Sequence, residues 1–375
     1  MRSVICLARI KLGGVLAEIL GQMERIENRH RGDSRELDVV SVPPGAGGVR
    51  AVWDVLLVPD YSDPNDPALR TNPPAGDPRV DLGRGLLLVE RLASGQNELV
   101  MHSCKPRGHF FIPAFPFGVG QAYVRGIDLD TYERNPYGWD PEGVISVAYK
   151  LSRLVRDNNV STEYAARVVD YGEDRQQVFP GPVGSESATA YRAGVAHDWL
   201  DRRDATSLRR LCDAYWGIGP ERITGRLHHS LVHCEASAHC AYAEDAVREV
   251  VTGLEALLKT GRYAATAQFV QRVPVLAQEL GFKGVTRRLC EQVYRWRSQV
   301  SHGARTSMFS SRAEAETPAA SVQQRRTLDK ALLIQTVLRT ALARALLDPS
   351  FRRLFRRRGT IRARWPAHNE RGQVL

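Results

Sequence analysis

Apolar residues in this 375-residue chain follow one pattern before Trp199 and another after it. In the first part, short apolar runs of strand length alternate with turn-forming residues. In the second part, as far as Asp348, apolar residues recur at three- and four-residue spacing. The pattern predicts an α+β chain, with a mixed strand-bearing region at the N-terminal side and an all-α antiparallel helical bundle after it.

The N-terminal region is predicted to hold short strands and two helices around turn-rich segments. Residues 33–84 are rich in Pro, Gly and Asp, a composition typical of turns and linkers. The predicted elements are a helix over 1–30, a strand over 52–58, a hairpin joining 86–89 to 99–101, strands at 110–112 and 123–124, a helix over 142–157, and a hairpin joining 166–169 to 177–179. No repeat or nucleotide-binding glycine motif indicates a role for this region.

Six helices are predicted in the second part of the chain. They cover residues 205–216, 220–243, 244–260, 263–280, 285–303 and 322–347. Gly261, Gly281 and Gly303 each stand where one of these helices should end. The predicted division is therefore an N-terminal mixed region over 1–195, a helical bundle over 200–350 and a basic C-terminal tail over 351–375.

Charge is unevenly distributed along the chain. The net charge is +10, and residues 281–375 carry about 20 Lys and Arg against about 6 Asp and Glu, so the remainder is slightly acidic. A basic C-terminal region can attract phosphate backbones. The alternative is a solvated helix end or a frayed terminus. Because Arg outnumbers Lys by about 46 to 6, the bias also fits a GC-rich coding genome.

The chain has the composition of a soluble globular protein, and its cysteine usage and N-terminus predict a cytoplasmic location. No apolar run reaches the roughly 18 residues needed to cross a bilayer. Arg9 and Lys11 interrupt the first apolar run and no small-residue cleavage site follows, so no signal peptide is expected. The six cysteines are scattered, which favours reduced thiols over a disulfide framework.

An Arg followed five residues later by a His occurs three times in the chain. With so many arginines, about one such match is expected by chance, so the spacing alone selects none of them. The three pairs are Arg25 with His30, Arg192 with His197, and Arg297 with His302. The third pair stands near the end of a predicted helix, after a helix-Gly-helix-Gly framework.

Three segments around this third pair resemble the HEPN superfamily, in particular the Apea-like HEPN proteins of bacterial defence systems. They are Leu254–Leu258, Phe269–Arg272 and Tyr294–Gly303. The resemblance is clear over 244–305 and extends over 205–348. It implies a helical HEPN-like domain in which Arg297 and His302 form the RNA-cleaving pair.

The resemblance implies a metal-independent endoribonuclease that needs no cofactor and acts as a toxin in stress or anti-phage abortive infection. A histidine can serve as acid or base near neutral pH, and an arginine can hold two phosphate oxygens. The family is typically dimeric, so a homodimer, and possible control by an antitoxin-like partner, are expected. The alternative is a non-catalytic module that binds RNA, a nucleotide or a partner protein. Ser298, where HEPN nucleases often have Asn, Asp or His, favours that alternative.

Several residues are candidates for supporting the pair. Glu255 could hold Arg297 or Arg272 in position, or form the polar edge of a helix. Supporting roles are also predicted for Ser298 and Tyr294, and RNA contacts for Arg272, Arg295 and Arg305. Tyr294 and Trp296 could stack on bases, but their helical spacing favours the core.

The remaining clusters carry weaker chemistry. His229, His233 and Cys240 lie within about 40° on a helical wheel and could hold zinc, but no CxxC pair accompanies them. A polar helix surface is the favoured interpretation, and no metal site is predicted. His102, Cys104 and His109 flank a strand end without an acidic or serine partner fixed by spacing.

Overall fold

The computed structural model describes residues 48–60, 79–89, 118–158, 160, 162–172, 175–181, 199–240, 243–261, 264–301, 322–369, 372 and 374. The chain divides into two compact units, Met1–Gly48 and Val49–Leu375. All elements below belong to the second unit, and the helix predicted over 1–30 lies outside the described residues. None of the helices in these ranges is long and apolar enough to cross a bilayer.

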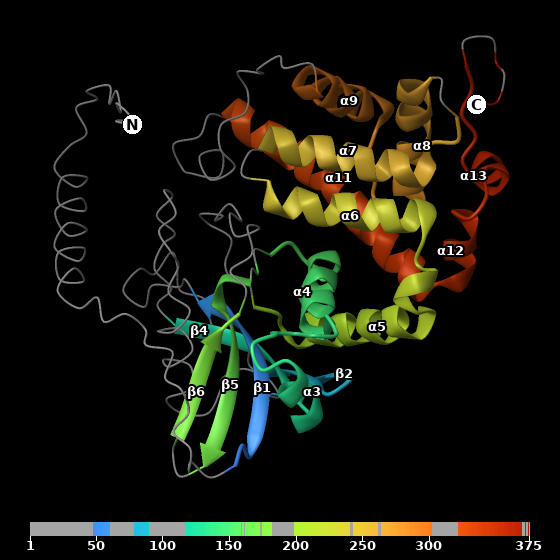
Figure 1. Cartoon of the computed structure of the whole chain (residues 1–375). Helices are drawn as coiled ribbons and strands as arrows, with labels where there is room; N and C mark the ends of the chain where they lie inside the picture. Colours follow the sequence, from blue (N-terminus) through green and yellow to red (C-terminus); the bar gives the residue numbers. More distant parts are fainter. Residues whose placement is uncertain are drawn as a thin grey trace, which may run out of the picture. The chain divides into compact units, whose positions relative to one another are not determined.

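A six-stranded antiparallel sheet forms the N-terminal half of this unit (Figure 1). Its strands are β1 (Ala51–Asp60), β2 (Arg79–Gly83), β3 (Leu86–Val89), β4 (Gly118–Ile127), β5 (Ala165–Gly172) and β6 (Arg175–Pro180), in the spatial order β2-β3-β4-β1-β5-β6. The predicted strand over 52–58, the one at 123–124 and the hairpin of 166–169 with 177–179 are confirmed.

The predicted pairing of the strand at 86–89 with 99–101 is wrong. β3 turns back through Arg84 and Gly85 onto β2, not onto 99–101, and its other edge pairs with β4. Both Arg84 and Gly85 have positive φ, and the glycine tolerates this without strain. The segments 99–101 and 110–112 lie outside the described residues.

The central strand β1 is buried on both faces. Leu56 and Val58 belong to the main core, whereas Val55 and Leu57 belong to a second cluster. Successive side chains of a strand point to opposite faces, so a strand between two apolar layers reads as an unbroken apolar run.

The C-terminal half is helical, as the apolar periodicity predicts (Figure 1). After α3 (Leu129–Arg134) and α4 (Val144–Val155), which belong to the sheet region, come α5 (Arg202–Ile218), α6 (Gly225–His239), α7 (Ala243–Leu258), α8 (Ala265–Glu279), α9 (Arg287–Ser301), α11 (Val322–Leu347), α12 (Pro349–Leu354) and α13 (Arg358–Arg364). The predicted helices over 205–347 are thus found, with ends shifted by a few residues. Gly281, with φ +91°, follows the end of α8 as predicted, whereas Gly303 lies outside the described residues.

The hydrophobic core is continuous from the sheet into the bundle. It includes Leu56 of β1, Ile145 of α4 and Leu208 of α5, and it extends through α7, α8, α9 and α11. α11 lies centrally, since it contacts α4, α5, α6, α7, α9 and α12. The bundle therefore packs on the sheet through α4 and α5.

The C-terminal segment is part of this core, so the alternative of a solvated helix end or a frayed terminus does not describe it. Phe351, Phe355, Ile361 and Trp365 are buried. The rings of Phe355 and Trp365 are stacked, with centroids 5.5 Å apart. The basic side chains lie between these aromatic anchors, so α12 and α13 hold the arginines on the surface of a folded element.

Candidate functional site

The predicted site centres on α7 and α9, which pack side by side (Figure 1). Glu255 of α7 faces α9 and accepts a hydrogen bond of 3.0 Å from the Tyr294 hydroxyl through Oε1. Its Oε2 lies 3.4 Å from Nη2 of Arg297. Of the three roles considered for Glu255, namely holding Arg297, holding Arg272 or forming a polar helix edge, the geometry supports the first.

Tyr294 forms the floor of the site. The residue is 8% exposed, and its ring lies against that of Phe269 of α8, with centroids 5.3 Å apart. Burial raises the pKa of Tyr294, and the neighbouring Glu255 carboxylate raises it further. Tyr294 is thus a neutral hydrogen-bond donor, and its burial with Trp296 confirms the core interpretation of both aromatic residues.

Arg297 occupies the boundary between this floor and solvent. Its side chain is 30% exposed, and its guanidinium carbon lies 5.7 Å from the centre of the Tyr294 ring. The distance of 3.4 Å to Glu255 is longer than the roughly 2.7–2.9 Å of a strong charge-assisted hydrogen bond. Nε is buried without a hydrogen-bond partner among the described residues. The contact with Glu255 therefore orients the guanidinium, and the part of the group that solvent reaches can still donate to an anion.

The neighbouring candidates on α9 lie on different sides of the helix. Ser298 is half-buried, and its side chain forms no hydrogen bond with another described residue. Arg295 is exposed, but two residues turn an α-helix by about 200°, so it faces away from Arg297. Arg295 and Arg297 therefore cannot hold the same phosphate group, and an RNA contact by Arg295 stays a prediction.

The second member of the predicted pair follows this helix directly. The last residue of α9 is Ser301, and His302 is the next residue in the chain. Both His302 and Arg305 lie outside the described residues. The described part of the site is thus the arginine with its acidic and aromatic supports.

The prediction that Arg272 contacts RNA is wrong. Its side chain is fully buried, and Nε donates to the carbonyl oxygen of Trp365 at 2.8 Å. Nη1 donates to the carbonyl oxygen of Leu258 at 2.8 Å, to Thr260 Oγ1 at 3.1 Å and to Gln268 Oε1 at 2.6 Å. Burial, aided by two neighbouring arginines, lowers the pKa of Arg272 to about 10, which leaves it charged at neutral pH. Arg272 thus caps the C-terminal end of α7 from within the protein.

The histidines and cysteine of α6 do not form one cluster. His233 Nδ1 lies 2.8 Å from Glu249 Oε2, Cys240 Sγ donates to the carbonyl oxygen of Ala236, and His229 is exposed beside His228. Within the described ranges, no group of three or more His, Cys, Asp or Glu side chains has the arrangement of a metal site. His102, Cys104 and His109 lie outside those ranges.

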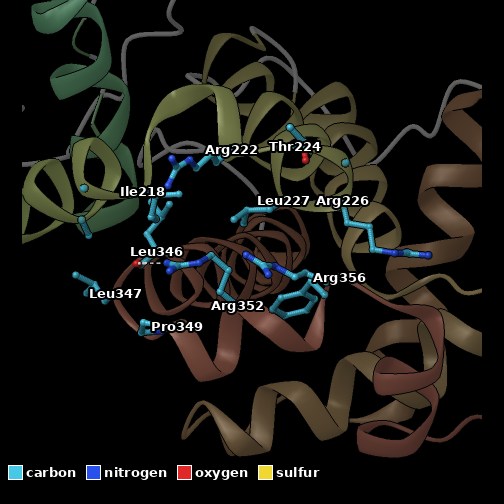
Figure 2. Close-up of a pocket in the computed structure, with 14 residues that line it drawn as sticks. Ile218, Arg222, Thr224, Arg226, Leu227, Leu346, Leu347, Pro349, Arg352 and Arg356 are labelled. Atoms are coloured by element: carbon cyan, nitrogen blue, oxygen red, sulfur yellow. Dashed lines mark hydrogen bonds between the residues drawn. The ribbon is translucent and has the colours of Figure 1, made fainter.

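Sequence reasoning missed a pocket lined by Arg222, Arg226, Arg352 and Arg356 (Figure 2). The run of arginines from Arg352 to Arg358 was the one signal in the sequence. It could not reveal the pocket, because the opposite wall comes from a segment more than a hundred residues earlier in the chain.

Comparison of the chain with protein-family models, with curated proteins and with solved structures finds no match.

Proposed function

We propose that the helical bundle is HEPN-like and acts as a metal-independent endoribonuclease, with Arg297 and His302 as the catalytic pair. The observation that supports the proposal is the position of Arg297. It stands in the last turns of α9, partly exposed, beside Glu255 and over Tyr294, and five residues before a histidine. A bacterial defence or stress role, in which the N-terminal region restrains the bundle, belongs to the same proposal.

The proposed reaction is an internal transesterification of RNA. The 2′-hydroxyl attacks the adjacent phosphorus, the bond from phosphorus to the 5′-oxygen breaks, and a 2′,3′-cyclic phosphate and a 5′-hydroxyl result. One general base takes the proton of the 2′-hydroxyl, and one general acid gives a proton to the leaving 5′-oxygen. A histidine can serve in either role at neutral pH.

Arg297 would stabilise the extra negative charge of the crowded phosphate. An arginine stays charged and presents several donors in one plane, which match phosphate oxygens. Glu255 restricts the guanidinium to one orientation before RNA binds, and such preorganisation favours the transition state. One chain supplies one His302, so the acid and the base would come from two copies of the chain in a homodimer.

The test is cleavage of end-labelled RNA in the presence of EDTA. The wild-type chain should produce cyclic-phosphate ends, and Arg297→Ala and His302→Ala should each lower the rate by about a hundredfold or more. Arg288→Ala is the matched control, since Arg288 is an exposed arginine in the first turn of α9. The assignment is eliminated if all three variants lose cleavage equally. It is also eliminated if Arg297→Ala and His302→Ala both retain cleavage.

A second candidate is a module that binds RNA without cutting it. The observation in its favour is that Glu255 already offsets part of the charge of Arg297. In addition, the residue that follows Arg297 is Ser298, whose side chain has no acidic or basic group. This candidate predicts that RNA is retained in a binding assay, that no new ends appear, and that Glu255→Gln strengthens binding. Cyclic-phosphate products from the wild-type chain would exclude it.

A further inference from the structure

A pocket of about 760 Å³ lies where the end of α5 meets the start of α6 and the junction of α11 with α12 (Figure 2). The short helix η2 (Pro220–Arg222) forms one rim, and α12 forms the opposite rim. Its volume lies in the range of about 300–1,000 Å³ that is usual for small-molecule sites. It shares no lining residue with the site around Arg297.

Four of the fourteen residues that line the pocket are arginines, and none is acidic. Two of these arginines are held in place by main-chain carbonyl groups. Arg226 donates to the carbonyl oxygens of Ala256 and Lys259 at the end of α7, and Arg352 donates to those of Ala345 and Leu346 at the end of α11. These bonds fix both guanidinium groups without neutralising either, and that of Arg226 points away from the other three arginines (Figure 2).

The other two arginines are freer. Arg222 is exposed, and its ion pair of 3.5 Å with Glu221 joins two side chains that are each more than 70% exposed, so water screens it strongly. Arg356 is exposed, and its side chain forms no hydrogen bond or ion pair with another described residue. Arg356 also helps to lower the pKa of Arg352, after burial, which shows that the two charges repel each other. An anion between the rims would relieve that repulsion.

The rest of the lining is apolar and leaves room for more than an inorganic ion. Ile218, Leu227, Leu346, Leu347, Pro349 and Phe355 contribute apolar surface, as Figure 2 shows for those it labels. At Gly217 and Gly225 an added Cβ would meet no heavy atom within 4 Å. Thr224 and Gly225 also place the N-terminal end of α6 at the pocket, and the Thr224 side chain does not cap it. The positive end of a 15-residue helix adds to the attraction for an anion.

We propose that this pocket binds a small organic phosphate, of about the size of a nucleotide. Its phosphate groups lie between Arg222 and Arg356, and its organic part lies against Ile218, Leu227 and Leu347. Charged guanidinium groups from opposite rims bind the phosphate oxygens, and the apolar wall excludes water from the remainder. The site is separate from the proposed RNA-cleaving site and is independent of its activity.

The experiment is isothermal titration of the full chain with ATP, with glucose 6-phosphate, with pyrophosphate and with adenosine, each to about 1 mM, the weak end of ordinary ligand affinities. At least one of the two organic phosphates should bind, pyrophosphate should bind more weakly, and adenosine more weakly still. Arg222→Ala and Arg356→Ala should each lower the affinity for the organic phosphate about tenfold or more, the usual effect of losing a charge-assisted hydrogen bond.

Two further variants separate a built pocket from a basic surface. Gly217→Leu fills the pocket from α5 without changing charge, at an exposed helical position with open space, and it should abolish binding. Arg357→Ala is the control, because Arg357 is exposed, adjacent to Arg356 and absent from the lining, and it should change affinity less than about twofold. The proposal is overturned if neither organic phosphate binds, or if binding survives Gly217→Leu. It is equally overturned if Arg357→Ala weakens binding as much as Arg356→Ala.

Discussion

Replacing Arg272 with alanine should lower the free energy of unfolding of the bundle and leave RNA binding by the folded chain unchanged. Arg272 is fully buried and donates to the carbonyl oxygens of Leu258 and Trp365 and to two side-chain oxygens. It therefore ties α8 to the end of α7 and to the C-terminal segment. Its loss acts on three elements at once.

The size of the effect follows from the acceptors left behind. Each buried acceptor without a partner costs about 1–3 kcal/mol. The two main-chain carbonyl groups alone therefore cost about 2–6 kcal/mol, and part of this is offset because a guanidinium no longer has to be removed from water. A net loss of about 3 kcal/mol in the free energy of unfolding is expected.

Urea unfolding followed by helical circular dichroism measures this change. Arg272→Lys keeps the charge but cannot reach acceptors on opposite sides, so it should lose at least about half as much stability. Arg287→Ala, at an exposed position of α9, is the control and should change stability by less than about 0.5 kcal/mol. If Arg272→Ala kept full stability while RNA binding fell, the structural role assigned to Arg272 would be refuted.

Two other buried charge networks yield predictions. Asp54 and Arg167 face each other on β1 and β5 and form an ion pair with two hydrogen bonds, of 2.7 and 2.9 Å. Asp54→Asn leaves the charge of Arg167 buried without its partner, so it should lower the free energy of unfolding by about 3–5 kcal/mol, measured by urea unfolding. A loss below about 1 kcal/mol would contradict this. Burial opposes ionisation of Glu235, but His239 and Arg153 outweigh it and lower its pKa. Glu235 therefore stabilises the fold above its ordinary pKa, and this stability is lost as pH falls through the lower, folded-state value. In thermal melts, Glu235→Gln should make the melting temperature depend less on pH in the acid range. If this pH dependence equals that of the wild-type chain, the pair with Arg153 contributes nothing to stability.

The candidate site could be located from the sequence only in part. The helical spacing of Tyr294 and Trp296 indicated the core. Glu255 was left open between a support for Arg297, a support for Arg272 and a polar helix edge, and the structure places it 3.4 Å from Arg297. Arg272 was misassigned because an arginine in a sequence window carries no sign of burial. Only the approach of the end of α7 and the carbonyl group of Trp365, about a hundred residues further on, makes an interior arginine stable.

The fold divides in the same way. Local periodicity was sufficient to predict the helices of the bundle, the strand over 52–58 and the hairpin joining 166–169 to 177–179. In each of these segments the apolar residues must face the layer or layers that pack on it. Which strand pairs with which depends on contacts distant in the chain. The partner of β3 therefore came only from the structure.

The sequence by itself determined the α+β class, the positions of most helices and the placement of Arg297 near the end of one of them. Only the tertiary structure decided that Arg272 is internal, that the basic C-terminal segment packs through Phe355 and Trp365, and that arginines from α6, α12 and η2 share a pocket. The physical reason is range: hydrogen-bonded helices and strand turns follow from neighbouring residues. The burial or exposure of a charge depends instead on which distant elements supply its partners.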